Sequence, residues 1–464
     1  MNANANPVTS SNLAGARFGR RPFSLAGFAV PGLALLGLLF PTSVPSEISM
    51  FGAEIDYSYI GAAEIAVLAL LLCLFARRGG YRRISLVISA TILFTIGVCT
   101  LLSPLAEFHY LAYGGPYLSL AVLLALNLED LLPPPQFLRI VFFVINIGMI
   151  TIGFTTYFAT DLVHDFLLGH YSGFSPWNLA GMLRSGKPVF TFVLHSTAGF
   201  VYCLFFYLNW QTWLRRGSTL CLIFSVCYVF LEIMLQSVTS YVSVGLISLV
   251  IIYRFTPRRT FVGLLALASC LTVVGAGIEI REISAAVLET FGSEHSGYLG
   301  RYSGEGTAVF CLAYLRAHPL RPIGLGYAGE LGVVGDSGPI EHMLRGSFPL
   351  VIAVYGGFWV FLRRNLHWKP SSIFVFALCV GFELGFSNLL YFRTLSLLPF
   401  VVVYLNSLER VMQGPKAATS RTGLPRLYDP GMSVMGGAFW PAQFARGAPA
   451  RAISLQAEGS AHER

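Results

Sequence analysis

The residues best suited to chemistry lie in one polar run, from Arg281 to Arg345, between two long apolar stretches of the chain. This run holds five arginines, three histidines and seven acidic residues. Arginine stays charged and binds phosphate oxygens through two parallel hydrogen bonds, so several arginines together can hold a diphosphate. A carboxylate or an imidazole beside them can accept the proton of an attacking hydroxyl. The run therefore predicts chemistry on a polar, phosphate-bearing substrate.

The middle of the run combines cations with tight turns. Thr307 to Ala317 is expected to form a short helix, which Pro319 prevents from extending. The glycines and prolines of HPLRPIGLGY come next, and they suit a tight turn that brings the backbone close to a ligand. Arg301 precedes this helix, Arg316 ends it and Arg321 follows it. These three arginines either bind a phosphate group or contact lipid head groups.

The end of the run reads GDSGPIEHMLRG and predicts the start of a second helix. Pro339 suits the first turn of that helix, and Ser337 or Gly338 suits its cap. Asp336 would lie beside the helix N-terminus, either as a capping residue or as an acid that faces the substrate. In the first case Glu341 would complete a capping box.

A second polar stretch, Ala159 to Pro188, precedes another apolar segment and supplies two more cations, Arg184 and Lys187. His195 lies just inside that apolar segment. An isolated histidine at such a depth either bonds a neighbouring helix or takes part in function. The sequence leaves both interpretations open.

Apolar residues dominate the rest of the chain. Of the 464 residues, 55% are hydrophobic and 12% are charged, about half the charged fraction of an average soluble protein. Repeated apolar stretches of about 20 residues exclude a soluble protein and predict an all-α, polytopic membrane protein instead of a β-barrel. The net charge of +8 does not indicate nucleic-acid binding, because the basic residues lie in short loops and tails. The eight cysteines form no CxxC pair, so neither a disulfide framework nor a metal cluster is implied, and no cofactor is expected.

About twelve transmembrane helices are expected, with the large polar run before the tenth. Lysine and arginine gather in alternate loops, which makes those loops and both termini cytoplasmic by the positive-inside rule. The expected divisions are a cytoplasmic N-terminal segment (1–21), helices one to nine (22–280) with an outer loop (159–188), a large periplasmic loop (281–347), helices ten to twelve (348–407) and a disordered cytoplasmic tail (408–464).

The order of these features resembles the O-antigen polymerase and ligase superfamily, the Wzy-like enzymes. The resemblance rests on the number of spans, the large outer loop and the order of motifs within it. Those motifs are Arg301, a short helix, HPLRPIGLGY, and DSGPIEHMLRGSFPLVIAVYGG, in which a helix runs into the next span through a glycine turn. RSGKPVFTFVLHSTAG is similar to the family's earlier outer-loop pattern, and the match covers about residues 150 to 410. The resemblance implies a GT-C-like helix bundle in the bacterial inner membrane.

The resemblance also implies a metal-independent glycosyltransferase that moves a glycan from undecaprenyl diphosphate to a sugar hydroxyl at the periplasmic face. Arg184 and Arg301 would hold the diphosphate, with Lys187, Arg316 or Arg321 as further ligands. The product would be O-antigen, capsule or exopolysaccharide. Besides its lipid-linked oligosaccharide substrate and membrane lipid, such an enzyme would work with a chain-length regulator and a flippase.

Asp336 occupies the position where ligases of this superfamily carry a catalytic histidine. The departure favours a polymerase of repeat units over an O-antigen ligase. It also leaves the general base open among four residues, which are Asp336, Glu305, His342 and His195.

Two other functions use acids elsewhere in the chain. Glu54 and Asp56, in the first outer loop, either bind a metal ion or act as a base in a different lipid-linked glycosyltransferase, or they are solvated loop residues. Glu64, Glu232 and Glu383 lie in apolar segments and could carry protons in a transporter or flippase.

Overall fold

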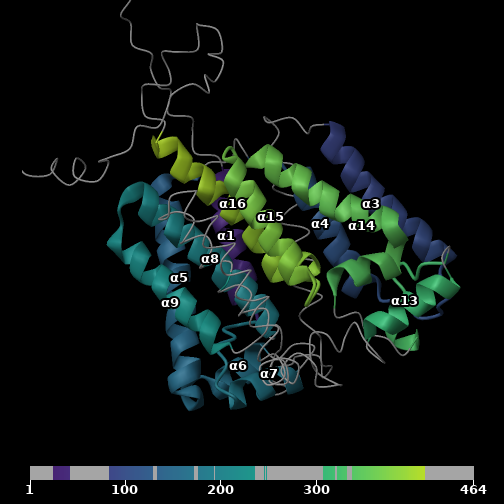
Figure 1. Ribbon diagram of the computed structural model, residues 1–464, viewed down its shortest axis with the longest axis horizontal. Coiled ribbons are helices and arrows are strands. Elements are labelled where there is room, and N and C mark those ends of the chain that lie inside the picture. The colour runs from purple at the N-terminus through teal and green to yellow at the C-terminus, as the bar shows by residue number, and fades with distance from the viewer. Residues whose placement is uncertain are drawn as a thin grey trace, which may run out of the picture. The chain divides into compact units, whose positions relative to one another are not determined.

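The computed structural model describes residues 25–41, 83–128, 133–171, 176–192, 194–235, 307–318, 321–331 and 337–412, with Gly245 and Ile247 (Figure 1). All of them belong to one unit of the chain, Met1–Gln413. Within these ranges the chain is mostly helical and forms no strand, which agrees with the predicted all-α class.

The described ranges contain two groups of helices, one before and one after residues 248–306. The earlier ones are α1 (Leu25–Leu39), α3 (Arg83–Leu102), η1 (Tyr110–Gly114), α4 (Gly115–Ala125), α5 (Pro135–Phe158), η2 (Thr160–Leu162), α6 (His164–Tyr171), α7 (Pro176–Arg184), α8 (His195–Arg216) and α9 (Thr219–Met234). The later ones are α13 (Thr307–Ala317), η3 (Ala328–Leu331), α14 (Gly338–Asn365), α15 (Lys369–Glu383), η4 (Asn388–Leu390) and α16 (Phe392–Met412).

Three helices, α3, α5 and α14, are long and apolar enough to cross a membrane. This length and composition support membrane association of the chain. The complete set of about twelve spans remains a prediction. The predicted N-terminal segment (1–21) lies outside the described residues, and so do the part of the predicted periplasmic loop before Thr307 and the part of the predicted tail beyond Met412.

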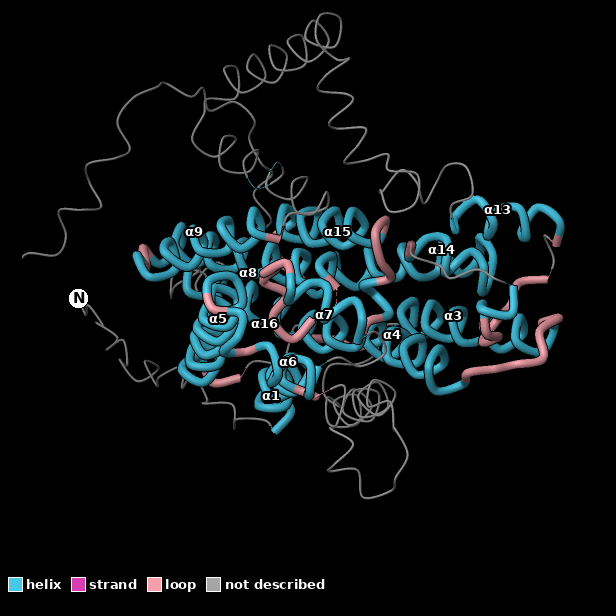
Figure 2. The backbone as a smooth tube through the Cα atoms, turned by 90° about the horizontal axis from the view of Figure 1, so that it is seen from below, coloured by secondary structure: helices cyan, strands magenta, loops and turns pink. Residues whose placement is uncertain are grey.

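The helix α8 lies at the centre of the described part of the chain. Every residue from Ser196 to Thr212 is buried, as expected for a helix with apolar neighbours on all sides. The helices α9, α15 and α16 pack around it (Figure 2).

One end of the helix bundle gathers arginines that the sequence predicts to be cytoplasmic. Arg364, near the C-terminus of α14, donates to Ser85 Oγ of α3 and to the carbonyl oxygen of Leu126 beyond α4. Arg215, near the C-terminus of α8, lies 3.8 Å from Glu409 of α16. The arginine-bearing ends of these helices therefore meet at one end of the bundle, as the alternating loop pattern requires.

The opposite ends of α1 and α16 meet around Arg393, a fully buried residue in the first turn of α16. Its guanidinium donates to the carbonyl oxygens of Gly37, Leu38 and Phe40 at 3.1, 2.6 and 2.9 Å. The carbonyls of Gly37 and Leu38, in the last turn of α1, and that of Phe40, just beyond it, have no partner within the helix, and a positive charge is favourable there. Arg393 therefore caps α1 and joins it to α16.

The helix α14 consists of two segments joined at a kink. Gly346 and Ser347 have non-helical torsion angles, and φ of Ser347 is +57°. The N-terminal segment, 338–345, contains the end of the polar run, and the second segment, 348–365, contains the apolar span expected from Phe348. The structure thus confirms the predicted helix start with Pro339 in its first turn, and the glycine turn into the next span.

The predicted tight turn of HPLRPIGLGY lies against α3 and the N-terminal segment of α14. Gly324 N donates to the carbonyl oxygen of Arg345 at 3.1 Å, and Leu325 N donates to Thr100 Oγ1 of α3 at 3.0 Å. The sequence predicted that the glycines would let the backbone approach a ligand. In the structure they let it approach α3 and α14 of the same chain.

Replacing Gly324 by alanine is expected to destabilise the protein clearly more than replacing Gly217. Gly324 has φ of +56°, and an added Cβ would clash with the backbone of Thr100. Gly217 has a similar φ of +67°, but an added Cβ there meets nothing within 4 Å. The control should therefore show only the left-handed backbone penalty of about 1–2 kcal/mol. Thermal unfolding of both variants in detergent measures the difference, and equal midpoints would refute the steric argument.

Candidate functional site

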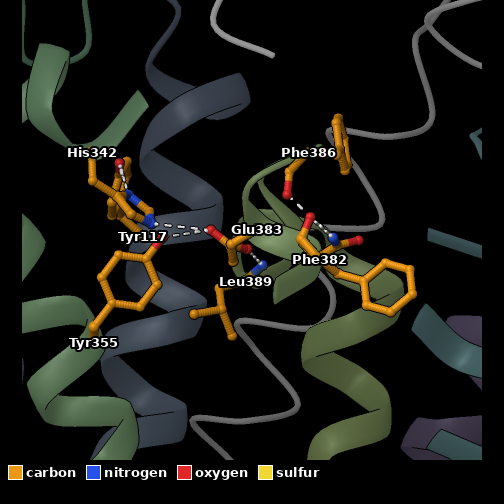
Figure 3. A network of polar contacts seen from close by, with 8 residues as sticks. Tyr117, His342, Tyr355, Phe382, Glu383, Phe386 and Leu389 are labelled. Atoms are coloured by element: carbon orange, nitrogen blue, oxygen red, sulfur yellow. Dashed lines mark hydrogen bonds and ion pairs between the residues drawn. The ribbon is translucent and has the colours of Figure 1, made fainter. Parts of the chain in front are cut away.

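A buried cluster of polar side chains joins α4, α14 and α15 (Figure 3). The hydroxyl of Tyr117 and Nδ1 of His342 lie 2.8 Å apart, and Nε2 of His342 lies 3.7 Å from Oε2 of Glu383. Tyr355 donates its hydroxyl hydrogen to the same carboxylate oxygen at 3.0 Å. His342 and Glu383 are both 0% exposed, so water does not screen their interaction.

The carboxylate of Glu383 is held at the start of α14. Its Oε1 accepts a hydrogen bond from Leu389 N at 2.5 Å. Its Oε2 lies so close to Gly338 that a Cβ at this position would clash with it. Glycine at position 338 therefore lets the first turn of α14 approach the carboxylate.

The two ring nitrogens of His342 face different partners. A phenol that donates to Nδ1 leaves the imidazole hydrogen on Nε2, which faces Glu383 (Figure 3). A carboxylate on one side of an imidazole stabilises the imidazolium that forms when the other nitrogen takes a proton. The phenol, imidazole and carboxylate can therefore accept a proton from the side of Tyr117 and stabilise the resulting charge.

The guanidinium of Arg345 bonds other groups of the same chain and so stabilises the fold of this region. Its guanidinium donates to Glu341 Oε1 at 2.5 Å and to the carbonyl oxygens of Gly324 and Gly326 at 2.8 and 3.2 Å. The same group lies 3.6 Å from the ring centroid of Tyr113. Only 1% of Arg345 is exposed. Its bonds to Gly324 and Gly326 therefore hold the glycine turn on α14, away from solvent.

Two capping expectations for α14 are only partly met. Ser337 is the N-cap residue, as predicted, but its buried hydroxyl makes no capping hydrogen bond. Glu341 bonds Arg345, and in the described part of the chain it completes no capping box with Ser337. The carboxylate of Glu341 is instead paired with Arg345, one turn later in the same segment.

Two of the predicted diphosphate ligands lie near the N-terminal segment of α14. Arg316 lies in the last turn of α13 and Arg321 follows the helix, and both are exposed. The helix α13 packs on this segment through a small apolar cluster that includes Cys311, Ile340 and Leu344. The structure thus packs the helix that carries Arg316, and the chain that follows Arg321, on the segment that carries His342. Three other predicted site residues, Arg301, Glu305 and Asp336, lie outside the described residues.

The remaining predicted residues belong to α7, α8 and the loop between them. Arg184 ends α7 and is exposed, while Lys187 is partly buried, and loss of hydration lowers the pKa of its ammonium group. His195 is the first residue of α8. Two residues later, Thr197 donates to Asn388 Oδ1 at 3.1 Å. Asn388 precedes Leu389, the donor to Glu383, so η4 connects the start of α8 to the cluster.

The acids considered for other functions divide between two places. Glu383 belongs to the buried cluster, and Glu232 is buried in α9. Glu54, Asp56 and Glu64 fall outside the described ranges. Across the described ranges, no three side chains of the types that bind metals are grouped to hold an ion.

Sequence reasoning did not find Tyr117 and Tyr355, although both contact the cluster directly. Each lies in an apolar segment, where a tyrosine is an ordinary packing residue. Tyr117 does follow Gly114, Gly115 and Pro116, an irregular start for a membrane helix. That irregularity was a signal that backbone at this position serves more than membrane crossing.

Comparison with known proteins assigns no function to this site. No protein-family model, no curated protein and no solved structure matches the chain.

Proposed function

We propose that this protein is a polymerase of undecaprenyl-diphosphate-linked oligosaccharide repeat units, acting at the periplasmic face of the bacterial inner membrane. The observation that carries the proposal is the buried group Tyr117–His342–Glu383 at the start of α14. It lies where the large polar run enters the next apolar helix. The exposed guanidinium groups of Arg316 and Arg321 nearby, and the motif order shared with the Wzy-like enzymes, support the same reaction.

The proposed reaction is a single displacement at the anomeric carbon of the donor sugar. A hydroxyl oxygen of the acceptor sugar forms the new glycosidic bond as the bond to the diphosphate oxygen breaks. The diphosphate leaves with its electron pair, and arginines stabilise the developing charge. Arg316 and Arg321 are assigned this role, together with Arg301 and Arg184 from the family resemblance.

The acceptor hydroxyl must also lose a proton. We assign His342 as the group that holds it, with transfer through the Tyr117 hydroxyl, which lies 2.8 Å from Nδ1. Glu383, 3.7 Å from Nε2, then stabilises the imidazolium. Asp336, Glu305 and His195 remain alternative bases from the sequence.

A second candidate function is proton-coupled transport of a lipid-linked glycan. The observation that favours it is the burial of two carboxylic acids, Glu232 and Glu383, in apolar helices. Ionisable groups at such positions commonly mark proton pathways. In this reading the same His342–Glu383 pair would bind and release protons during transport.

Reconstitution separates these functions. The purified protein is placed in liposomes with a lipid-linked single repeat unit, and the glycans are released and sized. A ladder of longer chains supports a polymerase. Movement of the lipid-linked unit across the bilayer without a new glycosidic bond supports a transporter. Transfer of a preformed long chain to an acceptor, without elongation of single units, supports a ligase.

A further inference from the structure

An apolar groove runs between α3 and the second segment of α14. Its volume of about 590 Å³ lies within the range of about 300–1,000 Å³ typical of small-molecule sites. The lining residues come from both helices and are Ile88, Thr91, Phe348, Pro349, Ile352, Ala353, Gly356, Gly357 and Val360.

The chemistry of the groove fits a hydrocarbon chain. The polar side chain in its lining is that of Thr91, whose hydroxyl donates to the carbonyl oxygen of Val87 at 2.8 Å and is thereby satisfied. Phe348 and Ile352 are 66% and 70% exposed, and both belong to a helix long and apolar enough to cross a membrane. Such side chains are stable in contact with lipid and unfavourable in contact with water.

Two adjacent glycines of α14 form the groove in different ways. A Cβ on Gly357 would lie 2.5 Å from Ile88 Cγ2, so this glycine allows α3 to pack closely. A Cβ on Gly356 would meet nothing within 4 Å, so this glycine leaves the floor of the groove open. Ala353, one turn earlier, adds only a methyl group to the lining. The helix α14 therefore packs closely on α3 at Gly357 and leaves open space at Gly356.

The groove begins where the candidate site ends. Phe348 and Pro349 follow the Gly346–Ser347 kink directly, and the segment before the kink carries His342. A lipid whose chain lies in the groove would have its head group beside the N-terminal segment of α14. Arg316 and Arg321 also lie near that segment, and they suit a diphosphate head group.

We propose that this groove binds the polyprenyl chain of the lipid-linked donor and so places its diphosphate at the candidate site. The inference rests on the proposed function for the identity of the lipid. It adds a substrate-binding surface in the membrane, formed by α3 and α14, that the polar residues alone do not predict.

Photolabelling tests the groove directly. The purified full chain in lipid nanodiscs is irradiated with undecaprenyl diphosphate that carries a diazirine in its chain, and labelled peptides are mapped by mass spectrometry. The expected labels lie on residues 348–360 and on the facing part of α3. Gly356→Phe fills the groove and should lower this labelling about tenfold, which corresponds to about 1.4 kcal/mol of binding free energy.

Gly97→Phe is the matched control. Gly97 lies in α3, is exposed, and has nothing within 4 Å of an added Cβ, but it does not line the groove. Labelling of this variant should stay within about twofold of the unmodified protein, less than 0.5 kcal/mol of binding free energy. Equal labelling of Gly356→Phe and Gly97→Phe would overturn the proposal. So would equal displacement of the probe by excess phosphatidylethanolamine and by excess undecaprenyl phosphate, because the groove would then bind any membrane lipid.

Chain elongation, measured on the same samples, keeps this inference separate from the proposed function. Specific labelling without elongation would overturn the polymerase and leave the polyprenyl groove in place. Normal elongation by Gly356→Phe, despite lost labelling, would overturn the groove as the donor site and leave the polymerase in place.

Discussion

Replacing His342 by glutamine is expected to lower the rate of chain elongation by roughly 10²–10⁴-fold, the usual contribution of a general base. Glutamine retains a polar group of similar size that can still meet the Tyr117 hydroxyl, but it does not take up a proton at neutral pH. Glu383→Gln should also slow elongation, because a neutral amide does not stabilise the imidazolium as a carboxylate does. Elongation by purified protein in liposomes measures both effects.

His318→Gln provides the matched control for this experiment. His318 follows α13 and is exposed, so the same chemical change there should leave elongation near the unmodified rate. The thermal unfolding midpoint of each variant shows whether it is folded. A folded His342→Gln protein that elongates chains at the unmodified rate would remove His342 from the mechanism.

Replacing Arg345 by methionine is expected to destabilise the protein by about 3–5 kcal/mol, the usual cost of removing one partner of a buried ion pair. The change leaves the carboxylate of Glu341 without its cation. It also leaves the carbonyl oxygens of Gly324 and Gly326 without their donor. Thermal unfolding in detergent, followed by size-exclusion chromatography, should show a lower midpoint and less folded protein.

A second substitution tests the cause of this loss. Glu341→Leu, added to Arg345→Met, removes the buried charge as well and should recover part of the lost stability. Arg316→Met alters an exposed arginine and should change the midpoint little. If Arg345→Met unfolds at the same temperature as Arg316→Met, the ion pair and the bonds to the glycine turn do not hold this region together.

Local patterns predicted several elements of this fold. Pro319 and the apolar spacing before it indicated α13, and the structure has that helix at Thr307–Ala317, as expected. Pro339 indicated the start of α14, and Gly346 indicated the turn into its second segment. These predictions succeed because proline and glycine restrict or free the backbone at their own positions, whatever surrounds them.

The sequence alone did not reveal which polar residues bond one another. Tyr117 and His342 are separated by 225 positions, and Arg393 and Gly37 by 356. Such pairs form only when helices pack, and packing depends on side-chain shapes along whole helix faces. For this reason Arg345, one of the arginines of the polar run, proved to hold the glycine turn.

The sequence by itself therefore determined the helical, apolar class of the chain, the extent of α13, and the start and kink of α14. Composition and hydropathy decide whether a segment prefers lipid to water, and each segment carries that information locally. The tertiary structure alone decided that His342 lies between Tyr117 and Glu383, and that Arg393 caps α1. Those arrangements arise because buried polar groups must find partners, and the partners come from helices that are distant in the chain.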